Sequence, residues 1–157
     1  NPAALGELTR IAMNDGESEV RRVAIGALGY ATDQQVLPAL THALKDESWQ
    51  VREEAAGTLG KVKPRGAAEH LMAALNDAYW QVQLRAVRSL GRLKATEAVP
   101  SVIEKLSHET SNVRKEAAVA LGEIGDARAV PALEKARQDP DPDVRKLAAL
   151  AIAAIQK

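Results

Sequence analysis

Cysteine is absent from this sequence of 157 residues. The chain therefore has no disulfide, no thiolate zinc site and no cysteine nucleophile, a composition that leaves the compartment undetermined but favours the cytoplasm. An excess of one charge is also absent, because 21 Lys and Arg residues balance 21 Asp and Glu residues. No uninterrupted apolar run reaches the length that spans a bilayer, about 20 residues. We therefore expect no nucleic-acid partner and no membrane partner.

A two-residue motif returns along the chain at a fixed interval of 31 residues. Its members are Val20-Arg21, Val51-Arg52, Val113-Arg114 and Val144-Arg145, with Val82-Gln83 as a near match. A Leu-Gly pair follows each Val by eight residues and becomes Ile152-Ala153 at the last position. Self-similarity with a period of about 20 to 50 residues is typical of a solenoid, in which no single unit buries its apolar face alone.

We therefore predict one all-α domain, residues 1–157, built from five stacked two-helix repeats. Their approximate bounds are 1–31, 32–62, 63–93, 94–124 and 125–157. In the second repeat Thr32-Asp33 offers an N-cap for a first helix, and Gly60 lies near the end of the second helix. The second helices carry small residues where they face each other, such as Ala55 and Thr58.

Prolines recur in the first helices. Pro38, Pro100 and Pro131 occupy one repeat position, inside the early part of each first helix. Because proline removes a backbone hydrogen bond and clashes with the preceding turn, we expect these first helices to be bent.

The string Asp-turn-Val-Arg-x-x-Ala-Ala-x-x-Leu-Gly, with the first-helix proline, resembles the short HEAT-like repeats named after the phycobilisome lyases. The resemblance covers essentially the whole chain. It implies a right-handed α-solenoid with first helices on the convex side and second helices on the concave side. It indicates architecture more than activity, because one fold hosts unrelated functions.

Deoxyhypusine hydroxylases contain similar repeats, in which His-Glu follows the Val-Arg pair and holds a di-iron centre. Here Glu54 and Glu116 match the acid, but every histidine is missing from those places. The three histidines fall at three different repeat positions: His42, His70 and His108. There is also no Gly-rich phosphate loop and no arguable Ser-His-Asp set. We therefore expect no metal, no cofactor and no catalytic residue.

An acid stands five residues before the Val of most repeats. The set is Asp15, Asp46, Asp77 and Asp139, with His108 as the exception. Pairing within a repeat would break two pairs, because Gln83 and His108 belong to different repeats. If each Arg instead pairs with the acid of the next repeat, only one of the four pairs departs from Arg-Asp. The pairs are then Arg21-Asp46, Arg52-Asp77, Gln83-His108 and Arg114-Asp139.

We therefore predict a ladder between repeats, because a desolvated charge without its partner is costly. The alternative is that each Asp only caps the second helix of its own repeat.

Side chains that project from the second helices of the second and third repeats form a predicted binding ridge. It comprises Trp49, Gln50, Glu53, Trp80, Gln81, Leu84, Arg85, Arg88 and Arg92. The only two tryptophans occupy equivalent positions on adjacent repeats, about 10 Å apart at normal helix separation. Tryptophan is enriched in binding hot spots, and arginine suits acidic groups.

Two alternatives stay open for the ridge. Both tryptophan rings can fold over the seam between repeats and cover small residues there. The arginines can be neutralised by acids of neighbouring repeats, namely Glu53, Glu54, Glu116 and Glu123.

We expect a non-catalytic module that binds or scaffolds a protein or peptide, and an acidic segment would suit the arginines. One alternative, by family analogy, is a subunit of a bilin lyase or chromophore-handling complex. The other is an engineered repeat protein, against which the uneven sequences of the five repeats argue.

The two ends differ in character. The chain begins at Asn1 rather than Met, which suggests a trimmed or processed product, and Glu7, Thr9 and Arg10 give the first helix a partly polar outer surface suited to a cap. The last helix is apolar nearly all round, with Leu150 and Ile155 among its residues. Because a terminal repeat should be polar outside, we expect further repeats beyond this end or self-association there.

Overall fold

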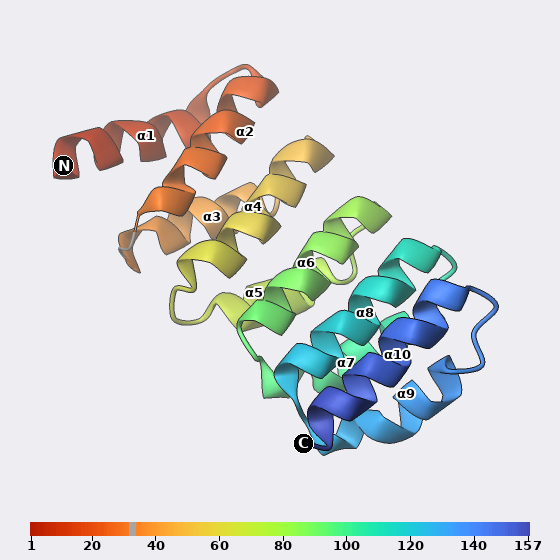
Figure 1. Cartoon of the computed structure of the whole chain (residues 1–157). Helices are drawn as coiled ribbons and strands as arrows, with labels where there is room; N and C mark the ends of the chain where they lie inside the picture. The colour runs from red at the N-terminus through yellow and green to blue at the C-terminus, as the bar shows by residue number, and fades with distance from the viewer. Residues whose placement is uncertain (32–33) are drawn as a thin grey trace. The chain divides into compact units, whose positions relative to one another are not determined.

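The computed structural model describes residues 1–31 and 34–157, and within these ranges every regular element is a helix (Figure 1). The predicted all-α class is confirmed. No helix in these ranges is long and apolar enough to cross a bilayer. The N-cap expected at Thr32-Asp33 lies outside the described residues. The helices group into two compact units, Asn1–Ser89 and Leu90–Lys157.

The first unit consists of helix pairs joined by short turns. Its helices are α1 (Pro2–Asn14), α2 (Ser18–Ala27), α3 (Leu37–Ala43), α4 (Trp49–Val62), α5 (Ala67–Ala74) and most of α6 (Trp80–Arg92), with 3-10 turns η1 (Leu28–Tyr30) and η2 (Gln34–Val36). The second helices α2 and α4 pack side by side, α1 packs on α2, and α3 packs on α4 (Figure 1).

The second unit repeats this arrangement. After the end of α6 it contains η3 (Thr96–Ala98), α7 (Val99–Glu104), η4 (Lys105–Ser107), α8 (Ser111–Ile124), η5 (Ala127–Ala129), α9 (Val130–Ala136) and α10 (Pro142–Ile155). Helices α8 and α10 pack side by side, α7 packs on α8, and α9 packs on α10 (Figure 1).

The repeated motif residues form the core of both units. Val51, Val82 and Val144 have no exposed surface, and neither do Leu59 and Leu121. Burying such a side chain fully contributes about 1.5–3 kcal/mol. The 31-residue period is therefore the period of the buried positions.

Pro38, Pro100 and Pro131 lie in the first turns of α3, α7 and α9. A 3-10 turn precedes each of them. At the start of a helix the missing N–H of proline has no intrahelical partner to lose. Each of these first helices therefore begins as a 3-10 turn and continues as a short α-helix, and the expected bend stays a prediction.

In α4, α6 and α8 the glycine of the Leu-Gly motif lies inside the second helix, where the next second helix approaches closely. A Cβ on Gly60 would lie 3.0 Å from the Cα of Ser89 in α6, and one on Gly122 would lie 3.0 Å from the Cα of Ala151 in α10. Gly60 is therefore not a cap. The left-handed C-cap of α4 is Lys63, with φ of 54°.

We predict that Gly60→Ala lowers the free energy of unfolding by about 1–3 kcal/mol, because the added methyl overpacks the helix contact. It would also displace Ser89, whose hydroxyl donates to the Ala56 carbonyl at 2.6 Å. Urea unfolding followed by circular dichroism measures the change. The control is Gly6→Ala in α1, where a Cβ meets nothing within 4 Å. It should raise stability by up to about 1 kcal/mol through helix propensity. A neutral or stabilising Gly60→Ala would contradict the close approach.

Candidate functional site

Three arginines of second helices bond the acid of the following repeat. In each pair Nε donates to Oδ2 at 2.8–2.9 Å, and the pairs are Arg21 with Asp46, Arg52 with Asp77, and Arg114 with Asp139. Nη2 also donates to Oδ1 in each pair, so the contact is bidentate. Every side chain in these pairs is at most 16% exposed. Charge-assisted pairs of this geometry are among the stronger polar contacts in proteins.

The same arginines also bond the turn of their own repeat. Nη1 donates to the carbonyl oxygen six residues earlier at 2.8–2.9 Å, from Arg21 to Asp15, from Arg52 to Asp46 and from Arg114 to His108. The planar guanidinium presents five donors in a fixed fork, so it can serve both partners at once. One side chain thus ties the turn of its own repeat to the acid of the next.

Each ladder acid also closes the turn that leads into its own second helix. Asp46 Oδ1 accepts from the Ser48 amide at 2.9 Å, and Asp77 Oδ1 accepts from the Tyr79 amide at the same distance. The ladder and the local contact at the start of the helix are therefore two bonds of one carboxylate. Burial raises the pKa of Asp46, but the hydrogen bonds from Arg21 and Ser48 outweigh it and hold this pKa below its ordinary value.

Gln83 and His108 replace the arginine and the acid at one step. Gln83 Nε2 donates to the Asp77 carbonyl at 2.7 Å, so it keeps the contact within its repeat. His108 Nδ1 accepts from the Thr110 amide at 2.9 Å, as the aspartates do. Burial, together with the charge of Lys105, lowers the pKa of His108 and favours the neutral ring that this acceptor needs. The two residues lie in different units, so their pairing stays a prediction.

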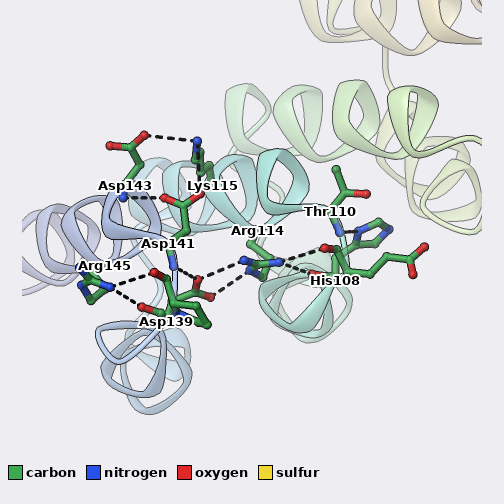
Figure 2. A network of polar contacts seen from close by, with 10 residues as sticks. His108, Thr110, Arg114, Lys115, Asp139, Asp141, Asp143 and Arg145 are labelled. Carbon is green, nitrogen blue, oxygen red and sulfur yellow. Dashed lines mark hydrogen bonds and ion pairs between the residues drawn. The ribbon is translucent and has the colours of Figure 1, made fainter.

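A second group of charges lies beside the ladder in the second unit (Figure 2). Lys115 Nζ on α8 lies 3.5 Å from Asp141 Oδ2 and 3.3 Å from Asp143 Oδ2. Asp141 is the N-cap of α10 and accepts from the Asp143 amide at 2.8 Å. This amide bond lowers the pKa of Asp141 against the opposing effect of burial. Lys115 thus ties α8 to the start of α10, a contact that the repeat pattern did not indicate.

The first tryptophan of the predicted ridge stacks on a tyrosine of the next repeat. The rings of Trp49 and Tyr79 have centroids 5.5 Å apart and planes 11° apart, and Arg52 Cζ lies 5.6 Å from the Tyr79 centroid. Tyr79 is 45% exposed and Trp80 is 36% exposed, while Trp49 is half-buried. Trp49 therefore covers the seam between repeats, as one alternative expects, and Trp80 stays at the surface. Tyr79 was not among the predicted residues.

Gln81 and Arg85 lie one turn apart on α6, and both are half-buried. Gln81 Oε1 and Arg85 Nε are buried atoms with no hydrogen-bond partner among the described residues. The Arg85 guanidinium lies on α4, because a Cβ on Gly57 would be 2.8 Å from its Cζ. Buried polar atoms are normally hydrogen-bonded. The ridge therefore holds one acceptor and one donor, one turn apart on α6, that no described residue bonds.

The other predicted ridge residues differ in exposure. Gln50 is exposed, whereas Glu53, Leu84 and Arg88 are half-buried on α4 and α6. Arg92 is exposed and belongs to the second unit, so the ridge described in the first unit ends at Arg88.

Glu54 was a candidate for neutralising the ridge arginines. It lies instead over Gly26 of α2, with Oε2 at 3.5 Å from Nη1 of Arg22. Glu54 is therefore paired with the preceding repeat.

A family model of HEAT repeats matches residues 6–81 and 68–153. These matches cover nearly the whole sequence. The chain belongs to the HEAT repeat family. The resemblance to HEAT repeats of the lyase type is thereby confirmed, and the α-solenoid fold with it. No curated protein matches the sequence.

Solved HEAT and armadillo structures share this fold. A complex of CpcE and CpcF of phycocyanin lyase from Nostoc sp. PCC7120 has 26% identity and a TM-score of 0.71, covering 100% of this chain and 66% of that chain. Human deoxyhypusine hydroxylase has 22% identity and a TM-score of 0.66, with coverage of 99% and 75%. A designed armadillo repeat protein in complex with the peptide (KR)4 has 21% identity and a TM-score of 0.70, with coverage of 98% and 92%.

The likeness to the hydroxylase and to the armadillo protein shows the fold alone. In the part of this HEAT repeat chain that the structure describes, no group of three or more His, Asp or Glu residues could hold a metal ion.

We predict that Arg114→Gln lowers the free energy of unfolding by about 3 kcal/mol, because it leaves the buried Asp139 carboxylate without its partner. Glutamine should keep the bond to the turn carbonyl, as Gln83 does. Arg145→Gln is the matched control, since Arg145 occupies the same repeat position but, among the described residues, donates only to the carbonyls of Asp139 and Pro140. It should cost about 1 kcal/mol or less. Guanidinium unfolding of dilute protein at neutral pH measures both, and equal losses would refute the role of the ladder pair.

We also predict that acid weakens the ladder through Asp46. Its pKa is lowered in the folded state, so its stabilising effect is complete above the unfolded-state pKa of about 3.9 and is lost as the pH falls toward the folded-state pKa. Asp46→Asn should therefore be less stable than the parent at pH 7 and lose less stability between neutral and acid pH. The control is Glu97→Gln, which changes an exposed acid. A parallel pH profile for Asp46→Asn and the parent chain would rule out this contribution.

Proposed function

We propose that this HEAT repeat chain is a non-catalytic module that binds an extended peptide or protein segment along the ridge of its first unit. The observation that carries the proposal is the pair of buried, unpartnered polar atoms on α6, Gln81 Oε1 and Arg85 Nε, next to exposed aromatic rings. A buried polar atom costs free energy until a ligand supplies its hydrogen bond. A ligand toward which these two side chains turn outward would remove that cost.

Aromatic side chains supply the apolar part of the surface. Tyr79 and Trp80 are both partly exposed, and Trp49 holds Tyr79 in place by stacking. Tyrosine and tryptophan bury a large area with little loss of rotamer freedom and are enriched in binding hot spots. The rings are therefore suited to an apolar side chain of the ligand.

The polar pair suits the backbone of an extended ligand. A peptide group offers one N–H donor, which fits Gln81 Oε1, and one carbonyl acceptor, which fits Arg85 Nε. Arg85 keeps a positive charge beside them, and its position over Gly57 is set by the helix contact. An acidic side chain in the ligand would gain a charge-assisted hydrogen bond there. The expected ligand is a segment that alternates acidic and apolar residues.

The test uses the fluorescence of Trp49 and Trp80, the only two tryptophans in the chain. A short peptide of alternating Glu and Leu residues should shift this fluorescence on binding, and a peptide of alternating Lys and Leu should not. Arg85→Ala and Trp80→Ala should each weaken binding about tenfold or more. The controls are Arg137→Ala and Tyr30→Ala, which remove an exposed arginine and an exposed aromatic residue outside the ridge. Equal binding by all four variants would contradict the proposal that the ridge binds the peptide.

A second candidate is a subunit of a bilin lyase or chromophore-handling complex. It is favoured by the 26% identity, over the whole of this chain, to the complex of CpcE and CpcF of phycocyanin lyase. Co-expression with a phycobiliprotein and a bilin separates the two candidates. Visible absorbance of the phycobiliprotein that requires this chain would support the lyase subunit.

A further inference from the structure

The first repeat exposes a face that later repeats bury. Val20 is 42% exposed, whereas its equivalents Val51, Val82 and Val144 have no exposed surface. The difference is that each of these later valines follows another repeat. Val20 lies in a groove of about 350 Å³ between α1 and α2, whose apolar lining is Leu8, Ile11, Val20, Val23, Ala24 and Ala27. The polar side chains of α1 therefore do not cap this end completely.

Among the described residues, the first repeat has a ladder acid without an arginine, and the last repeat has a ladder arginine without an acid. Asp15 Oδ1 accepts from the Glu17 amide at 2.9 Å, as the inner ladder acids accept from their own turns, but no guanidinium in the described residues bonds the Asp15 carboxylate. Arg145 donates through Nη1 to the Asp139 carbonyl at 2.7 Å, just as Arg114 donates to the carbonyl six residues before it (Figure 2). Its Nε and Nη2 meet no carboxylate within residues 1–31 and 34–157. One end of the chain thus has the acid of a rung and the other end has the arginine.

We propose that α10 of one copy docks beside α2 of a second copy, head to tail, with Arg145 of the first copy bonding Asp15 of the second. The contact would continue the interface by which α2 packs against α4 and α8 packs against α10. It pairs the open guanidinium with the open carboxylate and covers Val20 and the groove between α1 and α2. Such a contact is heterologous, because the two copies use different surfaces.

Residues of the last repeat make this contact weaker than an inner one. Ala153 stands where the inner second helices have glycine, and a Cβ on Gly122 would already lie 3.0 Å from the Cα of Ala151. Two helices joined through Ala153 must therefore sit further apart. At the end of α9 the ion pair of Glu134 and Arg137 replaces Ile103 of α7 and Leu106 of η4, so this part of the last repeat adds little apolar contact. The association is reversible and depends on concentration.

Sedimentation velocity tests the proposal from about 5 μM to about 500 μM, a range that brackets a micromolar dissociation constant. The average mass of the parent chain should rise above the monomer mass of 16.8 kDa as concentration increases. Asp15→Arg and Arg145→Glu should each weaken association at least about tenfold, because each variant alone brings like charges together. An equimolar mixture of the two should recover the association of the parent chain, because every end then meets an opposite charge on the other variant.

A second pair of variants keeps the test decisive if a charge swap disturbs folding, which circular dichroism reports. Val23→Glu places a charge in the groove, and Glu54 at the same position of the second repeat shows that the fold accommodates it. It should weaken association, whereas Tyr30→Glu should not, because Tyr30 is 90% exposed and lies outside the groove. A monomeric parent chain at every concentration would overturn the proposal. So would a mixture that associates no better than its components.

Discussion

A guanidinium that bonds two repeats at once is the contact on which the stacking order depends. Arg52 reaches back to the carbonyl of Asp46 in its own turn and forward to the carboxylate of Asp77 in the next repeat. Asp77 in turn closes its own turn through the Tyr79 amide. The bonds form one connected series within each unit, so each helix start is set partly by the repeat before it. Because both members of each rung are largely buried, neither can change alone without leaving a desolvated charge.

Close approach of the second helices is the other constraint, and it shapes the surface as well as the core. Ser89 packs against the backbone of Gly60, and Ala151 packs against the backbone of Gly122. A second glycine on the preceding second helix leaves room for a long side chain of the next one. Glu54 lies over Gly26 and Arg85 lies over Gly57 for this reason. The placement of the ridge arginine thus follows from the packing of the helices.

The sequence was sufficient to predict the fold and the three Arg-Asp pairs of the ladder because both are periodic. The decisive clue to pairing was a single irregular step, where Gln83 and His108 replace the two members of one expected rung. Features that depend on backbone geometry escaped prediction. The hydrogen bond from each arginine to a backbone carbonyl involves no second side chain, so no residue type in the sequence indicates it. Gly60 resembled a cap because glycine suits both a left-handed turn and a close helix contact. Tyr79 escaped because its equivalents, Ser48 and Thr110, are not aromatic, and its only signal was its place beside Trp80.

Positions outside the two constraints are free to differ between repeats, and they do. At one position of the second helix the residue is Glu54, Arg85 or Leu147, and at another it is Gly57, Arg88 or Leu150. The first unit therefore presents charged and aromatic groups where the second unit presents a groove lined mainly by Val119, Leu147 and Leu150. Since the buried Val, Leu and Ala positions supply most of the stability, such changes alter the surface at little cost to folding. Stability and the proposed choice of ligand thus depend on different positions of the same 31-residue period. The fold could therefore be predicted from the repeat, whereas the proposed ligand depends on residues that depart from it.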